Sequence, residues 1–263
     1  MTERIAIDWR LPRPGPGALA VWRRNFLVWR KLILPSLCFN FGEPLLFLVG
    51  MGYGLGRFVG DMGDMPYLTF VASGLIASSA MNTASFEGLF SAFTRMVPQQ
   101  TYDAMLATPV DVDDIVGGEM LWCATKGLMI STAILIVAFD SVAALACVPV
   151  FLLIGLCFAG PALTVSALSA SYDFFTYYTT LVMTPMFIFC GVFYPVDSLP
   201  GWLQAVTACL PLTHAIALVR PLASGGDVAA PRGAVAHPAG RRLRPAGPGR
   251  SVPARRCPAG GHR

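Results

Sequence analysis

Two carboxyl groups in apolar surroundings are the first candidates for chemistry in this chain. Glu43 lies inside an apolar run, beside Pro44, and Glu87 lies at the far end of the next run. A charge at the centre of a bilayer costs about 2.5–3.5 kcal/mol on insertion scales, so both carboxyl groups are expected to face protein or water. Proton coupling is one interpretation. We favour the alternatives, a structural hydrogen bond at a helix break for Glu43 and an interface position for Glu87.

The remaining polar residues form no recognisable catalytic, cofactor-binding or metal-binding pattern. His214 is the only histidine before residue 221, and no Ser/His/Asp or paired-carboxylate arrangement can be assembled around it. The seven cysteines show no CxxC or other ligand spacing, which favours small buried hydrophobes over disulfides or a metal site. A phosphate loop of the form GxxxxGKS or GxxxxGKT is absent, so any ATP must be bound and hydrolysed by a partner. The sequence therefore predicts neither an enzyme nor a resident cofactor.

The composition is that of an integral membrane protein. The 263 residues are 55% hydrophobic and 13% charged, whereas soluble domains average about 45–50% apolar and about 25% charged residues. Eleven basic and fourteen acidic residues precede residue 221, while the last 43 residues hold eight Arg and one Asp. The net charge of +4 thus belongs to the tail. The predicted partner is the lipid bilayer, and no nucleic acid is expected.

Five apolar runs are long enough to cross a bilayer core, which needs about 20 helical residues. The first run ends in GMGYGLG, whose glycines predict close helix packing or a loosened helix end. In the third run, Lys126 lies close enough to the edge to snorkel. The fold class is therefore an all-α polytopic membrane protein with about five transmembrane helices. The runs cover about residues 32–56, 66–89, 117–139, 143–169 and 174–194.

The N-terminal region predicts a helix in the membrane interface. Residues 1–17 are polar, basic and rich in Pro and Gly, which indicates a flexible lead. The next residues place an apolar stripe at helical spacing beside Arg and Lys, as in interfacial helices, although the stripe could also start the first span. Seven Lys and Arg within the first 31 residues predict a cytoplasmic N-terminus. The stripe consists of Leu19, Trp22, Phe26, Trp29 and Ile33.

The segment from Arg95 to Glu119 is the longest polar interruption between the apolar runs, and this topology puts it in the cytoplasm. Thr101 can cap a short helix whose apolar face holds Tyr102, Met105 and Leu106. Asp111 followed by Asp114 resembles a capping box that starts the next helix. A loop with capped helices of its own suggests a docking surface for another protein.

Two prolines divide the apolar segment 198–219 that follows the fifth run. Pro200 and Pro211 predict two short re-entrant or interfacial helices on the outer face, with a sixth span as the alternative. In residues 221–263, Pro, Gly, Ala and Arg make up 32 of 43 positions, which predicts a disordered tail. Because GC-rich codons read out of frame give these residues, we also consider that the tail replaces a lost sixth helix. The coding DNA would test this.

A family resemblance adds to these inferences. The chain resembles the membrane subunit of a type 2 ABC exporter, and specifically the NodJ family, permeases paired with NodI in the export of nodulation lipo-oligosaccharides. The resemblance covers about residues 20–222. It is carried by WRRNFLVWRK, FGEPLLFLVGMGYGLG, SGLIASSAMNTASFEGLFSAFTRM, QQTYDAMLATPVDVDDIVGGEMLWCATK, SYDFFTYYTTLVMTPMFIFCGVFYPVDSLP and LPLTHAIALVRPL.

The resemblance implies six spans, an N-terminal interfacial helix, a cytoplasmic coupling helix between spans two and three, and outer re-entrant helices after span five. It also implies a homodimer, a NodI-like ATP-binding subunit and a bacterial inner-membrane location. We delimit a flexible N-terminus at 1–17, the transmembrane domain at 18–222 and the tail at 223–263. The coupling pattern matches at Tyr102, Asp103, Leu106, Thr108, Pro109 and Val110.

The function expected from these features is ATP-driven export of a lipo-oligosaccharide or a similar amphiphile by alternating access. The alternatives are export of another glycan, lipid or drug, an inactive truncated permease, and a membrane enzyme acting on lipid-linked sugar. Aromatic side chains of the fifth run could stack on sugar rings or acyl chains, or simply pack. Residues considered for the translocation path are Glu43, Tyr177, Tyr178, Phe187 and Phe193.

Overall fold

The computed structural model describes residues 13–59, 61–62, 65–139 and 142–223, and these are largely helical. The predicted lead lies mostly, and the predicted tail almost entirely, outside the described residues. A two-residue antiparallel pair, β1 (Asp61–Met62) with β2 (Met65–Pro66), is the only sheet among the described residues. The described part thus agrees with the all-α prediction.

The α-helices of the first half are α1 (Gly17–Lys31), α2 (Ile33–Val49), α3 (Gly56–Val59), α4 (Tyr67–Phe86), α5 (Ala92–Met96) and α6 (Thr101–Leu106). Those of the second half are α7 (Val112–Ala138), α8 (Val148–Leu168), α9 (Asp173–Tyr178), α10 (Thr184–Phe189), α11 (Gly201–Ala208) and α12 (Pro211–Ala223). Wider π turns are η1 (Gly50–Leu55), η2 (Glu87–Ser91) and η4 (Thr179–Met183), and 3₁₀ turns are η3 (Val142–Cys147) and η5 (Val196–Ser198).

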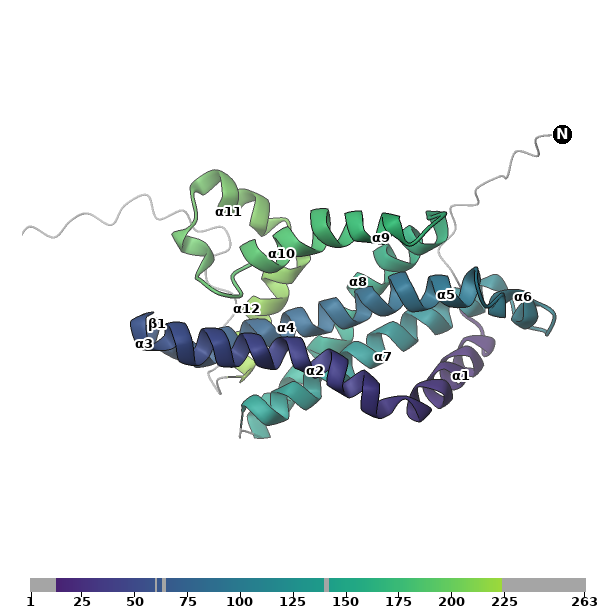
Figure 1. Ribbon diagram of the computed structural model, residues 1–263, viewed down its shortest axis with the longest axis horizontal. Helices are drawn as coiled ribbons and strands as arrows, with labels where there is room; N and C mark the ends of the chain where they lie inside the picture. Colours follow the sequence, from purple (N-terminus) through teal and green to yellow (C-terminus); the bar gives the residue numbers. More distant parts are fainter. Residues whose placement is uncertain (1–12, 60, 63–64, 140–141, 224–263) are drawn as a thin grey trace, which may run out of the picture. The chain divides into compact units, whose positions relative to one another are not determined.

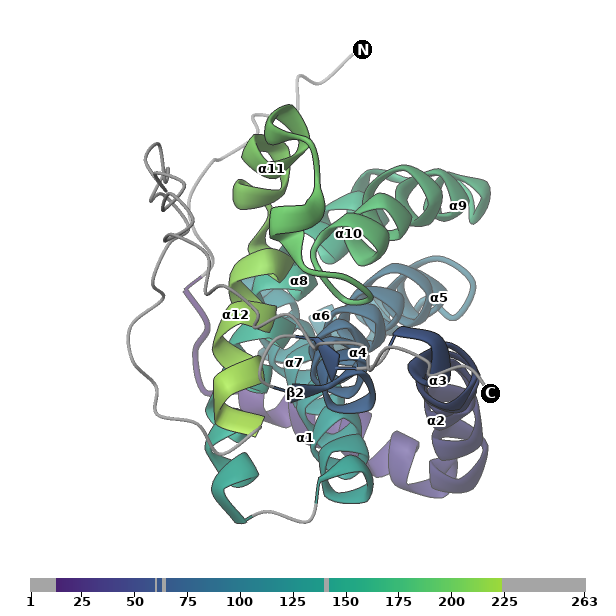
Figure 2. The ribbon, with the colours of Figure 1, turned by 90° about the vertical axis from the view of Figure 1, so that its left-hand side faces the viewer.

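Helices α4, α7 and α8 pack against one another and form the centre of the described bundle (Figure 1). Helix α12 and helix α2 flank them on opposite sides (Figure 2). Most of α4 is buried, and it is built largely of Ala, Ser, Gly and Thr. Small residues let helices approach closely where the hydrophobic effect gives little drive for association. Some of the hydroxyls are satisfied by backbone, since Ser78 donates to the Gly74 carbonyl at 2.8 Å and Ser131 of α7 donates to the Ile76 carbonyl at 3.1 Å, whereas the buried Ser85 Oγ has no partner among the described residues.

The contacts within this centre leave no room for an added carbon atom at several glycines. A Cβ at Gly155 of α8 would lie 2.6 Å from the Ala124 Cα of α7, and one at Gly127 would lie 3.0 Å from the Ala80 carbonyl oxygen of α4. The three helices therefore meet backbone to backbone. Their separation is set by these small residues and not by long side chains.

Within the described ranges, three helical segments are long and apolar enough to cross a membrane: Ile33–Gly52, Val112–Ala138 and Leu145–Leu168. They correspond to the first, third and fourth predicted spans. The other two predicted spans are helical as well, in α4 and in the continuous α9, η4 and α10. Helix α4 is rich in Ser and Thr, which lowers its mean hydropathy, and these side chains are hidden in the bundle.

The segment after α10 contains the two short helices predicted from its prolines. Helix α11 begins after Pro200, α12 begins at Pro211, and the two are bent by 85° relative to each other. Helix α12 is held against α4, because the Arg220 guanidinium lies 3.7 Å from the Phe70 ring centroid and donates to Ser73 Oγ at 3.3 Å. A bent pair of this kind is compatible with either a broken span or a re-entrant loop.

The buried stripe of α1 overlaps the predicted apolar stripe only in part. Ala18, Val21, Asn25 and Trp29 are buried against the bundle. Of the predicted stripe, Trp29 is buried, Trp22, Phe26 and Ile33 are half-buried, and Leu19 is 61% exposed. The stripe is shifted because α1 packs closely on α7, where only small side chains fit against Gly117 and Gly118.

The glycine-rich end of the first span is a loosened helix end, one of the two predicted possibilities. Its backbone widens into the π turn η1. A Cβ at Gly50 or Gly54 would have no described atom within 4 Å, whereas one at Gly52 would meet the Leu68 side chain of α4. The predicted close helix packing therefore occurs at Gly52 as well.

Replacing Gly155 by Ala is expected to lower the free energy of unfolding by about 1–3 kcal/mol, because the added methyl group overpacks the contact with Ala124. Gly160 in the same helix is the matched control, since its Cβ would meet only the flexible Met120 methyl group at 3.8 Å. Both changes gain about 1 kcal/mol of helix propensity. Thermal unfolding in detergent measures the difference. Equal midpoints for the two variants would contradict the backbone contact.

Candidate functional site: an exposed helix above a buried ion cluster

Helix α6 projects from the bundle at the end of α5 (Figure 1). Gln100 precedes it with φ 46° and ψ 33°, in the left-handed region, which turns the chain sharply out of the preceding helix. None of the six residues of α6, all of which the structure describes, is buried. Thr101 is its first residue and makes no capping bond to the helix, so the cap predicted at Thr101 is wrong.

The predicted coupling residues divide into an outward and an inward group. Asp103, Leu106, Thr108 and Pro109 are exposed, and the side chain of Leu106 is 45% exposed. Val110 is half-buried. Tyr102 is half-buried, and both Tyr102 and Leu106 line a largely apolar cavity of about 210 Å³ between α6 and the helices behind it. Leu106 therefore borders this cavity as well as the outer surface.

Tyr102 brings α6 into electrostatic contact with the interior of the bundle. Burial raises the pKa of its phenol above the ordinary value, and the negative charge of Glu119 raises it further. The phenol therefore stays neutral at physiological pH, next to the charges behind it. Burial opposes the charge of Arg95, but Glu119 and Glu87 outweigh that effect and raise the pKa of the Arg95 guanidinium.

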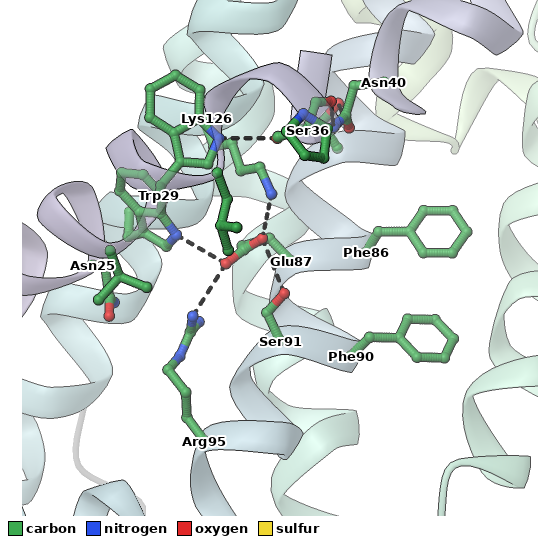
Figure 3. Close-up of a pocket in the computed structure, with 15 residues that line it drawn as sticks. Asn25, Trp29, Ser36, Asn40, Phe86, Glu87, Phe90, Ser91, Arg95 and Lys126 are labelled. Atoms are coloured by element: carbon green, nitrogen blue, oxygen red, sulfur yellow. Dashed lines mark hydrogen bonds and ion pairs between the residues drawn. The ribbon is translucent and has the colours of Figure 1, made fainter. Parts of the chain in front are cut away.

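Behind α6 lies a buried cluster of four charges, which we call the ion cluster: Glu87, Arg95, Glu119 and Lys126. The Glu87 carboxylate accepts from Lys126 Nζ at 2.6 Å and from Arg95 Nη1 at 3.2 Å (Figure 3). It also accepts from the Trp122 indole at 2.9 Å and from Ser91 Oγ at 3.0 Å.

Arg95 then bridges to Glu119, with Nη2 at 2.7 Å from Oε2. The side chains of Glu87 and Glu119 are 5% and 2% exposed, respectively. The formal charges of the four residues sum to zero, and each carboxylate has a cationic partner. This pairing is what makes buried charges tolerable.

The ion cluster overturns one sequence prediction and confirms another. Lys126 turns inward to Glu87 instead of snorkelling to the edge. Glu87 faces protein, as expected of a carboxyl group at the end of an apolar run, but its cationic partners were not predicted. The partners were missed because each charge was treated alone. The spacing of the residues could have indicated the cluster: Glu87, Ser91 and Arg95 recur every four residues and so share one face of a helical segment. On α7 the complementary face is formed by Glu119, Trp122 and Lys126.

The acidic residues at the start of α7 bind the N-terminal segment and form no capping box. Asp111 occupies the N-cap position without a side-chain cap. Asp114 instead accepts the Gly15 backbone N–H at 2.5 Å, and Asp113 accepts the Arg13 backbone N–H at 3.2 Å. These bonds anchor the start of α1 to the start of α7.

The five residues considered for a translocation path lie in three places. Glu43 borders a small cavity between α2 and α4. One turn further along α2, Phe47 packs against Phe187 and Phe193, with ring centroids 5.7 Å and 5.8 Å apart. Tyr178 packs against the core, while Tyr177 is exposed.

Comparison with known proteins gives a consistent result. The model of the ABC-2 type transporter family matches residues 18–222. The chain is 44% identical over 223 residues to Nodulation protein J of Rhizobium meliloti (strain 1021), covering 83% of this chain and 85% of the relative.

Other relatives extend the comparison. Nodulation protein J of Rhizobium leguminosarum bv. viciae is 46% identical over 83% of this chain and 86% of its own length. The inner membrane transport permease YadH of Escherichia coli (strain K12) is 23% identical over 73% of this chain and 75% of its own length. No solved structure matches the chain.

A family model that covers most of the chain, relatives above 40% identity over most of their length, and helices able to span a bilayer agree with one another. The chain belongs to the ABC-2 type transporter family and is a membrane permease subunit of an ABC exporter.

Proposed function

We propose that this permease exports a lipo-oligosaccharide or a similar amphiphile, driven by a separate ATP-binding subunit that docks on α6. The observation that carries the proposal is the position of α6: its outer face is exposed and its inner face touches the ion cluster. The relatives named Nodulation protein J support the substrate class. The absence of a phosphate loop from the sequence supports a partner that binds and hydrolyses ATP.

The outer face of α6 has the mixture of groups that a protein partner can recognise. Leu106 offers an apolar contact, and Asp103 in the first turn offers a negative charge. Asp103 also suits the positive end of the helix dipole, so it can be exposed without destabilising α6. Thr108 and Pro109 continue this surface into the loop towards α7.

The ion cluster offers a route from α6 into the membrane helices. Tyr102 lies beside Arg95 and Glu119, and Arg95 connects through Glu87 to Lys126. The four charged residues belong to α7 and to the segment running from α4 into α5. A push on α6 therefore shifts a charged contact between two central helices. Tightly packed elements of this kind respond by discrete rearrangement and not by gradual deformation.

The remaining parts of the proposal concern membrane topology and assembly. We place the N-terminus and α6 on the cytoplasmic side of the bacterial inner membrane, with α11 and α12 towards the outer face. The permease acts as a homodimer, and its partner is a NodI-like ATPase that binds the nucleotide. The basic residues of the N-terminal region support this orientation.

Replacing Leu106 by Glu is expected to lower co-purification of the ATPase at least about tenfold, since a charge replaces an apolar interface anchor. Leu168, which is 81% exposed at the end of α8, is the matched control. Its replacement by Glu is expected to leave the association unchanged. Equal losses in both variants, or none in either, would remove α6 from the docking role.

Reporter fusions test the orientation. Green fluorescent protein inserted after Val110 is expected to fluoresce, and alkaline phosphatase at the same position is expected to be inactive, because this loop faces the cytoplasm. Insertions within residues 57–66 are the control and should give the opposite pair of results. An active phosphatase after Val110 would reverse the topology.

A double-mutant cycle tests the ion cluster. Glu87→Gln alone is expected to destabilise the protein by about 3–5 kcal/mol, because it leaves buried cations without their carboxylate. Combining it with Lys126→Met is expected to cost less than the sum of the two single changes, by about 0.5–3 kcal/mol.

Unfolding in detergent measures these differences in stability. The control is Glu43→Gln, which changes an exposed carboxyl group outside the cluster and is expected to have little effect. Simple additivity of Glu87→Gln and Lys126→Met would show that the two residues do not act together.

A further inference from the structure

Three adjoining cavities form a furrow with a mixed polar and apolar lining, between α1 and α2 on one side and the segment from α4 to α5 on the other. The central cavity has a volume of about 660 Å³. It shares Asn25, Ser91 and Arg95 with a cavity of about 270 Å³ that reaches Gln99. At its other end it shares Asn40 and Thr83 with the small cavity of about 70 Å³ that reaches Glu43.

Nine neutral side chains that can both donate and accept hydrogen bonds line the furrow, beside apolar and charged ones. Amides and hydroxyls of this kind match sugar hydroxyls, each of which also donates and accepts. Arg95 and Lys126 in the lining are already paired with carboxylates, so a phosphate group would have to compete for them. Arg24 also lines the cavity that reaches Gln99 and donates to the Asn25 carboxamide, and the phosphocholine probe below tests whether it attracts a phosphate group. The neutral polar lining consists of Asn25, Ser36, Asn40, Ser79, Asn82, Thr83, Ser91, Thr94 and Gln99.

One buried donor in the furrow has no partner. Asn25 is 3% exposed, and its carboxamide oxygen accepts a hydrogen bond from Arg24 at 3.1 Å. Its Nδ2 group finds no acceptor among the described residues. A buried donor left unsatisfied costs about 1–3 kcal/mol. An acceptor on a bound molecule would remove that cost.

Aromatic and aliphatic groups complete the match to an amphiphile. The rings of Trp29, Phe86 and Phe90 line the central cavity, and Phe86 stacks on Phe90 with centroids 5.4 Å apart. Val28 and Leu32, also in the lining, are 50% and 57% exposed at its edge. A polar head can therefore enter the furrow while an attached acyl chain lies against its exposed edge.

We propose that this furrow binds the glycan head of the exported amphiphile before translocation. The furrow lies within one protomer, adjacent to the ion cluster that connects to α6. A volume of about 660 Å³ falls within the usual 300–1,000 Å³ of ligand sites. The proposal deepens the proposed function and rests on it for the class of substrate.

Binding to the full-length permease in tetraethylene glycol monooctyl ether, measured by native mass spectrometry without the ATPase, tests the furrow. Two probes share one tail and differ in the head: dodecyl maltotrioside and dodecylphosphocholine. The maltotrioside is expected to bind about tenfold more tightly, because only its head can use several donor and acceptor groups of the lining. Tighter binding of the phosphocholine would mark the furrow as a phospholipid site, and binding of neither probe would overturn the proposal.

Neighbouring substitutions on α1 locate the binding. Val28→Trp places an indole at the edge of the furrow, whereas Leu27→Trp places the same side chain at a similarly exposed residue that does not line it. Val28→Trp is expected to weaken maltotrioside binding at least about tenfold, and Leu27→Trp to leave it unchanged. Asn25→Leu is expected to weaken binding about fivefold through loss of one hydrogen bond. Equal affinities of the two tryptophan variants would exclude the furrow.

Co-purification with the ATPase separates this proposal from the docking of α6. Val28→Trp should retain the ATPase while losing the maltotrioside. Leu106→Glu should lose the ATPase while retaining the maltotrioside. Loss of both partners in Val28→Trp would indicate general misfolding, and Asn25→Leu, which preserves side-chain size, then decides the outcome.

Discussion

The buried ion cluster is the constraint around which the part of the bundle next to α6 is arranged. Two carboxylates and two cations placed in an apolar bundle are tolerable only while each has its partner. Removing one leaves an uncompensated charge with no water to solvate it. The segment from α4 to α5 and helix α7 must therefore keep a fixed register, with Glu87, Arg95, Glu119 and Lys126 at one level. Tyr102 places α6 next to Glu119 and Arg95 of this cluster.

Two different packing chemistries meet at this point. Beyond the ion cluster, α4, α7 and α8 approach through Gly, Ala and Ser, so their contacts are made largely by backbone and short side chains. At the cluster, long charged side chains and the Trp122 indole fill the space. The contacts among Gly, Ala and Ser are rigid, because they involve backbone and short side chains. The long charged side chains of the ion cluster can exchange hydrogen-bond partners, and they lie behind α6.

Much of the fold could be predicted from the sequence, because hydropathy and proline positions act locally. The apolar runs, the division at Pro200 and Pro211, and the short helix around Tyr102 and Asp103 are all present as helices. The pairing of Glu87 with Lys126 was missed because it joins residues 39 positions apart. The roles of Asp111 and Asp114 were also misread: local rules predict a capping box, but Asp111 makes no side-chain cap and Asp114 accepts the Gly15 amide of a distant segment. Contacts between segments far apart in the chain can be recognised in the sequence, at most, from complementary charges on the two segments.

The π turn η2 (Glu87–Ser91) limits which single-residue deletions this part of the chain can accept. An α-helix advances each residue by about 100° around its axis, and a π turn accommodates an extra residue without losing the helix. The extra residue rotates everything after it, including Arg95, relative to the small-residue face of α4. A single-residue deletion here would restore regular helix while turning Arg95 away from Glu119. This short segment is therefore intolerant of deletion.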